Sequence, residues 1–215
     1  MITVFVASYG YAHLAGGCVE SLLSQTRKPD RIVLVDDAAH DRLEVVGEIY
    51  GLETIIRDHN MGTTANFDDL LKNHVDGGRM MMLGADNWLR PDALEKMASV
   101  DADIVSTDIT ITGEWAIEWA KKLPAGEVEW RDGGYPIWRF RQKDIAKDNY
   151  IHGSSLYNVE KAKRVGYKGN DINGMCEDWY LWRGMLLEQG ATHTHIAEPL
   201  LYYRRHRHNF NKVHE

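Results

Sequence analysis

The chain has 215 residues, of which 44% are hydrophobic, and a formal net charge of -7 at pH 7. This length suits one globular domain with a sizeable core, and the acidic balance argues against a nucleic-acid-binding protein with a broad basic face. The two cysteines lie far apart, which predicts a protein without disulfides in a reducing cytoplasm. The sequence has no basic leader and no run of ~20 apolar residues, so no membrane-spanning helix is predicted. The protein could still dock peripherally at the inner membrane face.

Short apolar runs alternate with helix-like segments in the first half of the chain. Buried strands are predicted at residues 2–7, 31–37, 52–58 and 79–83. Helices are predicted at 14–25, within the segment 60–74 after its opening loop, and from Pro91 onward, where proline suits a first turn. This alternation predicts an α/β fold with a mixed, mainly parallel sheet flanked by helices.

The second half of the chain is less regular. Trp115 and Trp119 have helical spacing, and the glycines and proline that follow predict a loop or short hairpin. The remaining segments predict a strand at 151–157, a helix ending at Gly166, a helix within 176–190, and a last strand that runs into the basic segment RRHRH.

Polar residues follow the predicted strands at their carboxyl ends. Ser8 and Tyr9 follow the first strand, Asp36 and Asp37 end the second, and Asp86 follows the fourth. In open α/β sheets, ligands bind beyond the carboxyl ends of the strands. These residues therefore predict a ligand site at one edge of the sheet.

Six blocks, in this order, resemble GT-A-fold (Rossmann-like), inverting glycosyltransferases of the family 2 type: VASYGYAHLAGGCVESLLSQTRKPDRIVLVDD, NMGTTANF, MLGADNWLRPDALEKM, YIHGSSLYNVEKAKRVGY, CEDWYLW and YYRRHRHN. The resemblance extends over residues 3–209. It implies one GT-A domain over 1–215, with a nucleotide-binding half at 1–108 and an acceptor-binding half at 109–215. It also implies transfer of a sugar from a nucleoside-diphosphate sugar to a hydroxyl of a glycan or lipid-linked glycan, with Mn²⁺ or Mg²⁺ as cofactor.

The resemblance implies a donor-nucleotide site built largely from the strand ends. Carboxylates there can accept hydrogen bonds from a base N–H or from ribose hydroxyls. Asn60 is explained equally well as a turn or helix-capping residue. The family's donor-binding positions correspond here to Ser8, Tyr9, Asp36, Asp37, Asn60, Gly62, Asp86 and Arg204.

The family's metal motif is two aspartates separated by one residue, and this chain departs from it. Gly84 stands where the first acid is usual, and only Asp86 remains. Mg²⁺ and Mn²⁺ retain waters and take oxygens from a diphosphate, so we expect Asp86 to hold the metal with His206 as a second ligand and His208 as a near alternative to His206. The alternatives are a strand end without metal and, for the basic C-terminal segment, a solvated tail.

The resemblance implies that Asp178 is the general base that takes a proton from the acceptor hydroxyl. The alternative is that Glu177 and Asp178 only cap a helix, whose dipole favours acids at its start. Glu177 and Trp179 are expected to contact the acceptor, and His152 and Gly153 to pass beneath the donor sugar. His193 and His195, on one face of the last strand, are expected to be structural rather than a metal site.

Three other functions compete with this one. A non-catalytic module that binds nucleotide sugars or glycans is motivated by Gly84. A nucleotidyltransferase is disfavoured because the loop SYGYAHLAGG lacks the basic residues of a phosphate-binding loop. A dinucleotide-dependent dehydrogenase is disfavoured because no GxGxxG motif follows a predicted strand.

Overall fold

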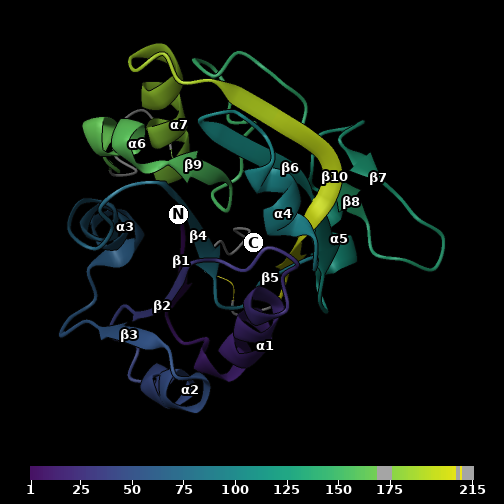
Figure 1. The fold of residues 1–215 in the computed structure, drawn as a ribbon. Coiled ribbons are helices and arrows are strands. Elements are labelled where there is room, and N and C mark those ends of the chain that lie inside the picture. Colours follow the sequence, from purple (N-terminus) through teal and green to yellow (C-terminus); the bar gives the residue numbers. More distant parts are fainter. Residues whose placement is uncertain (169–175, 207–208, 210–215) are drawn as a thin grey trace.

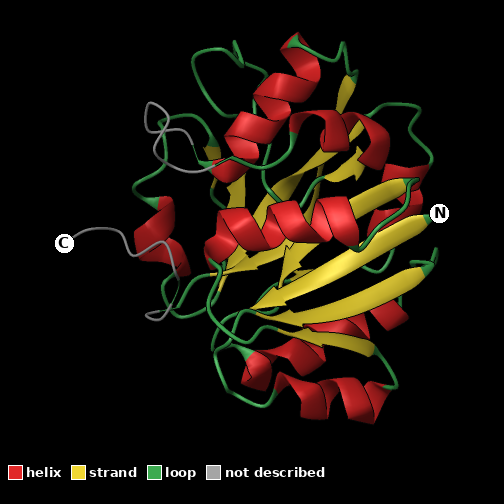
Figure 2. Ribbon diagram, turned by 90° about the vertical axis from the view of Figure 1, so that its left-hand side faces the viewer, coloured by secondary structure: helices red, strands yellow, loops and turns green. Residues whose placement is uncertain are grey.

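The computed structural model describes residues 1–168, 176–206 and 209. It has an α/β fold built on one curled sheet of ten strands, with helices on both faces (Figures 1 and 2). The main path of the sheet is β3-β2-β1-β4-β9-β6-β10-β5, and the short β7–β8 hairpin joins it through β6. The mixed α/β class predicted from the sequence is therefore confirmed.

The N-terminal part of the sheet is parallel, as its connecting helices require. Its strands are β1 (Ile2–Ser8), β2 (Arg31–Asp36), β3 (Glu53–Ile56) and β4 (Arg79–Gly84). The helices that connect them are α1 (Ala12–Leu23), α2 (Leu43–Tyr50) and α3 (Gly62–Asn73). Of these helices, α2 was not predicted from the sequence.

Strands β1, β2 and β4 are buried on both faces, which explains why they form continuous apolar runs, whereas the edge strand β3 is partly exposed. Along β1, Val4 and Val6 belong to a core cluster that includes Cys18 and Leu22 of α1. Phe5, which lies between them, belongs to the opposite cluster with residues of α3 and α7 (Glu177–Leu187). The alternation of side chains along a strand thus attaches a helix layer to each face.

The second half of the chain extends the sheet with mixed pairings. The long strands β6 (Ile104–Thr112) and β10 (His193–Arg204) run parallel to one another, and β9 (Leu156–Asn158) joins β6 to β4 by antiparallel pairing. The remaining elements are β5 (Trp88–Leu89), α4 (Ala93–Ala98), α5 (Ala116–Ala120), β7 (Val128–Glu129), β8 (Ile137–Trp138) and α6 (Val159–Val165).

Among the boundaries that differ from the sequence predictions, two are explained by the local backbone conformation. The strand predicted over 151–157 begins only at Leu156, because Ser155 bends back and both its N–H and its hydroxyl donate to the carbonyl of His152. The helix predicted from Pro91 begins at Ala93, with Asp92 in a non-helical conformation before it. The hairpin predicted in the irregular region is confirmed as the β7–β8 pair.

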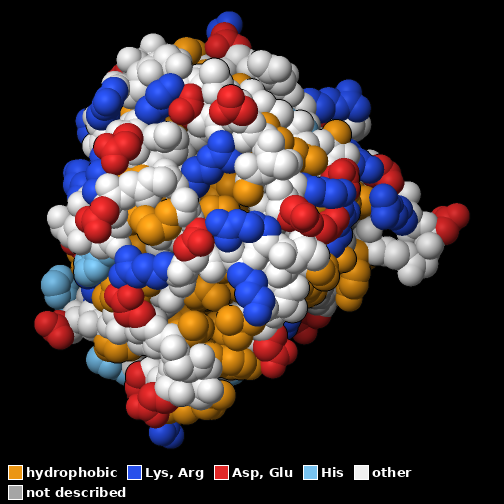
Figure 3. All heavy atoms as spheres, viewed as in Figure 1, with side chains coloured by type: hydrophobic (Ala, Val, Ile, Leu, Met, Phe, Trp, Pro, Cys, Tyr) orange, Lys and Arg blue, Asp and Glu red, His pale blue; other side chains and the backbone are white. Residues whose placement is uncertain are grey.

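The described part of the chain contains no helix that is both long enough and apolar enough to cross a membrane. On the face shown in Figure 3, Lys and Arg side chains lie among Asp and Glu side chains.

Candidate active site

The ends of β1, β2 and β4 meet at one edge of the sheet, as predicted. The register pairs Ser8 with Asp36 and Ala7 with Gly84, so the residues after these strands are brought together. Ser8 is buried and its Oγ accepts a hydrogen bond from the Tyr11 N–H at 3.3 Å. Tyr9, in contrast, is 53% exposed. An exposed ring at this edge is available to a ligand.

The two acids that end β2 have different surroundings. Both oxygens of Asp37 accept backbone hydrogen bonds, from the N–H of Met61 at 2.8 Å and of Gly62 at 2.9 Å. Asn60 Oδ1 accepts from the same Gly62 N–H, so the turn role considered for Asn60 is present. Asp37 therefore holds the start of α3. Asp36 accepts one bond from the Ala39 N–H within its own loop, at 2.8 Å.

The loop after β2 is strained and tied to α1. Ala38, His40 and Arg42 all have positive φ angles, between 57° and 67°, which residues other than glycine rarely adopt. Asp41 Oδ2 accepts a hydrogen bond from the N–H of Ala12, the first residue of α1, at 2.7 Å. Strain of this kind persists where surrounding structure enforces it and often marks functional sites. Asp41 is not among the site residues predicted from the sequence.

Asp86 lies just after β4 in a buried position, with 7% of its surface exposed. Its Oδ2 accepts from Asn209 Nδ2 at 3.0 Å and lies 3.3 Å from His206 Nε2. Burial raises the pKa of the Asp86 carboxyl, although His206 and Arg204 act in the opposite direction. The predicted partners Asp86 and His206 are thus adjacent, although 120 residues separate them in the chain.

Gly84 leaves its space to the side chain of Asn87. A Cβ atom at position 84 would lie 2.7 Å from Asn87 Nδ2 and 2.8 Å from Asp86 Oδ1. Asn87 Oδ1 in turn accepts a hydrogen bond from the Arg204 N–H at 2.9 Å. An aspartate therefore cannot occupy position 84 without displacing these two side chains. Where the family motif has an acid, this chain has an amide that anchors the C-terminal segment.

Among the described residues, no cluster of three or more His, Cys, Asp or Glu side chains could hold a metal ion. Asp86 and His206 still provide a desolvated carboxylate oxygen and an imidazole nitrogen side by side. Such a pair fits a divalent cation that takes its other ligands from water and a diphosphate, as Mg²⁺ does in many phosphate-binding sites.

The C-terminal segment is packed rather than a solvated tail over the residues that the structure describes. The Arg204 guanidinium lies 5.0 Å above the ring of Trp88, which itself stacks on Tyr202. Arg205 is 4% exposed and covers the ring of Trp119. The Nε atom of Arg204 is buried and has no hydrogen-bond partner in the described parts of the chain. Residues 207 and 208 of the basic segment lie outside the described residues.

Asp178 lies in the first turn of α7, next to Glu177, which begins that helix. Its Oδ1 accepts hydrogen bonds from the Trp179 N–H at 2.6 Å, the Cys176 thiol at 2.7 Å and Asn149 Nδ2 at 3.2 Å. Although the side chain is only partly covered, desolvation by the surrounding protein raises the pKa of Asp178 from 3.8 to about 6. Glu177 also raises this pKa, and the bond from Cys176 lowers it.

The two residues expected beneath the donor sugar, His152 and Gly153, have different neighbours. Gly153 faces Asp178, and a Cβ on it would lie 3.3 Å from Asp178 Oδ2. His152 is buried, and its Nε2 accepts the Thr107 N–H at 3.3 Å. Burial lowers the pKa of His152 to about 3, so the ring is neutral at physiological pH.

Trp179 packs against the core cluster on its side of the sheet, and its indole N–H donates to the Ile145 carbonyl at 2.8 Å. These contacts explain Trp179 as a packing residue, and its contact with an acceptor stays a prediction.

The paired histidines of β10 form a structural network, as expected. Ser106 Oγ lies 2.8 Å from His193 Nε2 and 3.0 Å from His195 Nδ1. His195 Nε2 reaches Asp108 Oδ1 at 3.0 Å, and Arg139 pairs with the other oxygen of Asp108 at 2.7 Å. The network ties β6 to β10, and its central Ser106 is fully buried, out of reach of a substrate.

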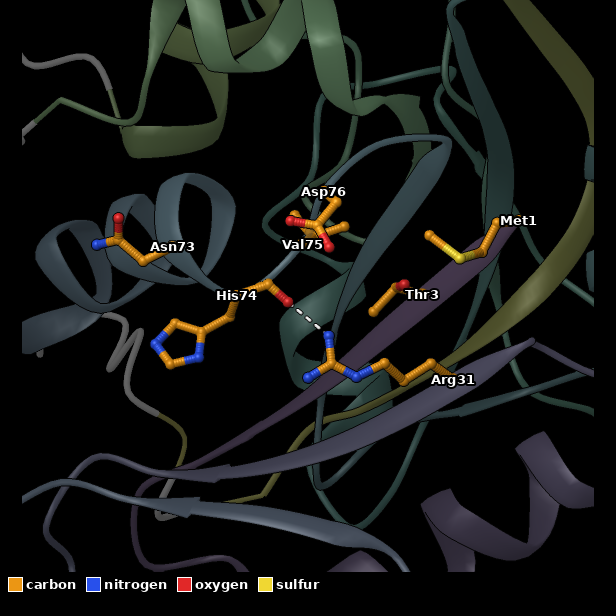
Figure 4. Close-up of a pocket in the computed structure, with 7 residues that line it drawn as sticks. All are labelled: Met1, Thr3, Arg31, Asn73, His74, Val75 and Asp76. Atoms are coloured by element: carbon orange, nitrogen blue, oxygen red, sulfur yellow. Dashed lines mark hydrogen bonds between the residues drawn. The ribbon is translucent and has the colours of Figure 1, made fainter.

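A cavity of about 420 Å³ lies elsewhere (Figure 4). Its lining includes the starts of β1 and β2, whose opposite ends carry Ser8 and Asp36. It therefore opens at the far edge of the sheet from the candidate site, and we assign it no part in the chemistry. The residues that line it are Met1, Thr3, Arg31, Asn73, His74, Val75 and Asp76.

The chain resembles known proteins both in sequence pattern and in fold. The family model described as glycosyl transferase family 2 matches residues 3–166. No curated protein matches the chain. The fold resembles S. aureus TarS 1–349 in complex with UDP-GlcNAc, with a TM-score of 0.72 and 14% identity over 97% of this chain and 59% of that one.

TarS 1–349 without ligand gives a TM-score of 0.68 at 15% identity, over 94% of this chain and 60% of that one. The mannosyltransferase PcManGT from Pyrobaculum calidifontis, in complex with GDP-Man and Mn²⁺, gives 0.67 at 14% identity, over 97% of this chain and 58% of that one. The chain thus spans about 60% of the length of these solved structures.

Proposed function

The chain belongs to glycosyl transferase family 2, a family of enzymes, and has the GT-A fold; from this premise we propose that it is an inverting glycosyltransferase. It moves a sugar from a nucleoside-diphosphate sugar to a hydroxyl of a glycan or lipid-linked glycan. The observation that carries the proposal is the environment of Asp178, a carboxylate whose pKa of about 6 suits a general base near neutral pH.

The donor nucleotide is assigned to the edge of the sheet where β1, β2 and β4 end. Asp36 and Ser8 lie side by side there, and the exposed ring of Tyr9 offers a face for a base. Within the described residues, the buried Nε of Arg204 has no hydrogen-bond partner, and a diphosphate oxygen would satisfy this donor. The solved structures of TarS with UDP-GlcNAc and of PcManGT with GDP-Man support a nucleotide sugar as the donor.

A divalent cation, Mn²⁺ or Mg²⁺, is assigned to Asp86 and His206. When bound, it supplies positive charge that stabilises the diphosphate as it leaves. Asp86 accepts a hydrogen bond from Asn209, which fixes the orientation of its carboxylate. Asn87 Oδ1 accepts a hydrogen bond from the Arg204 N–H. This bond keeps the C-terminal segment, which includes His206, next to Asp86. The Mn²⁺ in PcManGT supports the choice of metal.

The reaction is a single in-line displacement. The acceptor oxygen attacks the anomeric carbon while the bond from that carbon to the diphosphate breaks, and Asp178 takes the acceptor proton. With a pKa of about 6, most Asp178 side chains are ionised at pH 7, yet they remain basic enough to accept a proton. Glu177 is assigned to the acceptor, and His152 and Gly153 to the segment beneath the donor sugar.

Donor binding and acceptor binding are assigned to different halves of the chain. We assign donor binding chiefly to residues 1–108 and acceptor binding chiefly to residues 109–215, with the C-terminal segment returning to the donor. We place the reaction in the cytoplasm, the reducing compartment that the two distant cysteines favour, and at the inner membrane face if the acceptor is lipid-linked.

A calorimetric screen of nucleotide sugars, with and without Mn²⁺, tests the proposal. We expect one donor to bind selectively and to bind more tightly with metal, and purified protein to release its nucleotide in the presence of acceptor or water. A protein that binds a donor but never releases nucleotide, with any donor of the panel, would instead be a non-catalytic binding module.

A further inference from the structure

The two oxygens of Asp178 are treated differently by their surroundings. Oδ1 accepts three hydrogen bonds, from the Trp179 N–H, the Cys176 thiol and the Asn149 amide. Oδ2 lies over Gly153, where the missing Cβ would have come to 3.3 Å. A carboxylate oxygen that accepts three bonds has little capacity left to take a proton. Proton transfer is therefore directed to Oδ2, beside the one residue type that leaves room for an acceptor.

The Asn149 amide is oriented by its own hydrogen bonds. Its Oδ1 accepts the Ile151 N–H at 3.1 Å, which leaves Nδ2 directed toward Asp178 Oδ1. This arrangement fixes which end of the amide faces the carboxylate, because the end that accepts must lie next to the backbone N–H. Asn149 thus presents a donor, and not an acceptor, to Asp178.

The Cys176 thiol presents a second side-chain donor to Asp178. Cys176 immediately precedes α7, and its thiol lies 2.7 Å from Asp178 Oδ1. Desolvation, together with the charge of Asp178, raises the pKa of this thiol from 9.0 to about 12, so it keeps its proton at physiological pH. The thiol therefore donates to the carboxylate over the whole pH range in which Asp178 changes its charge.

We propose that Asn149 and Cys176 are positioning residues for sugar transfer, which together occupy Oδ1 of Asp178 and leave Oδ2 to receive the acceptor proton. The inference rests on the proposed role of Asp178. In the step itself, the acceptor O–H bond breaks and its proton goes to Oδ2. The new bond joins the acceptor oxygen to the anomeric carbon, and the diphosphate leaves with the electrons of the broken bond.

Hydrogen bonds to the ionised form lower the pKa of a carboxyl, so the two donors oppose the desolvation of Asp178. Two other titratable groups act on the same carboxylate. Glu177 precedes it in α7, and the buried hydroxyl of Tyr167, paired with Tyr157 at 2.8 Å, feels its charge. Neither a carboxyl nor a phenol group can carry a positive charge. The ionised form of Asp178 is therefore stabilised by its hydrogen-bond donors.

The pH dependence of kcat/KM tests the positioning role. Asn149→Asp keeps an acceptor for the Ile151 N–H but replaces the donor by a second carboxylate, and Cys176→Ala removes the thiol. In both variants we expect the acidic limb of the profile to move up by about one pH unit, the size expected for a lost charge-assisted bond. Cys176→Ser retains a hydroxyl donor and should keep the limb at the wild-type position.

If Asn149 and Cys176 had a purely structural role, all three variants would have a lower rate, and the acidic limb of their pH profiles would stay at the wild-type position. That result would overturn the inference. So would a Cys176→Ser profile that shifts as far as that of Cys176→Ala, since the donor would then have no effect on the base.

A second measurement tests the same contact without turnover. The rate at which iodoacetamide alkylates Cys176 at pH 8, followed by peptide mass spectrometry, should rise at least about tenfold in Asp178→Asn, because the neighbouring charge that holds the thiol pKa up is removed. Cys18 is fully buried and serves as an internal control. An unchanged rate contradicts the contact. If alkylation is faster in Asp178→Asn but the wild-type protein transfers no sugar from any donor, the contact stands while the proposed function, and with it the positioning role, is contradicted.

Discussion

Replacing Asp178 by asparagine should abolish transfer and, at the same time, stabilise the protein near neutral pH. The carboxyl has a pKa of 3.8 when unperturbed and about 6 in the fold, so the folded state binds its proton more tightly than the unfolded state does. Stability contributed by this group is therefore greatest below pH 4 and is lost as pH rises through about 6. Asparagine keeps the shape of the side chain and cannot ionise.

The size of the effect follows from the shift. A difference of about two pKa units corresponds to roughly 3 kcal/mol, and partial exposure of the side chain reduces the expectation to about 1–3 kcal/mol. Urea unfolding of wild type and Asp178→Asn at a series of pH values measures it. We expect the stability difference between the two proteins to grow in favour of the variant from pH 4 to pH 7 and then to level off.

Asp103→Asn is a matched control with the opposite sign. Burial acts against the ionised form of Asp103, but hydrogen bonds from Lys161 and Thr192 outweigh it and lower the pKa of the carboxyl. Its contribution is present above the unfolded-state pKa and is lost as pH falls, so this variant should be destabilised at pH 7.

If Asp178 only stabilised the start of α7 through its charge, its replacement by asparagine would instead cost about 0.3–1 kcal/mol at neutral pH. A less stable Asp178→Asn protein, or a difference that does not change with pH, would refute the reasoning. A variant that keeps most of its turnover would remove Asp178 from the chemistry.

The remaining predictions concern the donor site. Asp86→Ala should abolish the dependence of nucleotide binding on Mn²⁺ in calorimetric titrations, and an unchanged metal titration would show that Asp86 is not a ligand. Gly84→Asp should not strengthen metal binding, because its Cβ would displace the Asn87 amide from the Arg204 N–H; we expect a loss of about 1–2 kcal/mol in urea unfolding, and tighter Mn²⁺ binding without loss of stability would contradict this. Arg204→Gln should weaken nucleoside-diphosphate binding about tenfold while binding of the nucleoside alone changes little; an equal loss for both ligands would count against a diphosphate contact.

Local patterns were sufficient for the four parallel strands in the first half of the fold and for the edge where these strands end. Strands buried on both faces must be apolar at every position, and that signal needs no knowledge of their partners. The motif blocks added the family, which the match over residues 3–166 confirms. Because parallel neighbours end at the same edge, Ser8, Asp36 and Asp86 could be grouped before any coordinates were known.

The elements that were not predicted have local sequences that conceal them. Helix α2 contains Gly47, a poor helix former, which packs so closely on β3 that a Cβ would lie 2.0 Å from Thr54 Oγ1. Strand β6 contains the buried polar residues Ser106 and Asp108, whose partners His193 and His195 lie on β10. Both features make sense only once a distant segment is in place.

The same division holds at the candidate site. The sequence by itself determined which residues end the strands and which acid begins α7, since these depend on neighbours along the chain. Only the tertiary structure decided their partners: Asn209 and His206 beside Asp86, Asn87 in the space at Gly84, and Asn149 on the carboxylate of Asp178. Hydrogen bonds of this kind join segments 29 to 123 residues apart. Periodicity along one chain does not encode which of its polar groups will meet, because that is set by how the helices and strands pack.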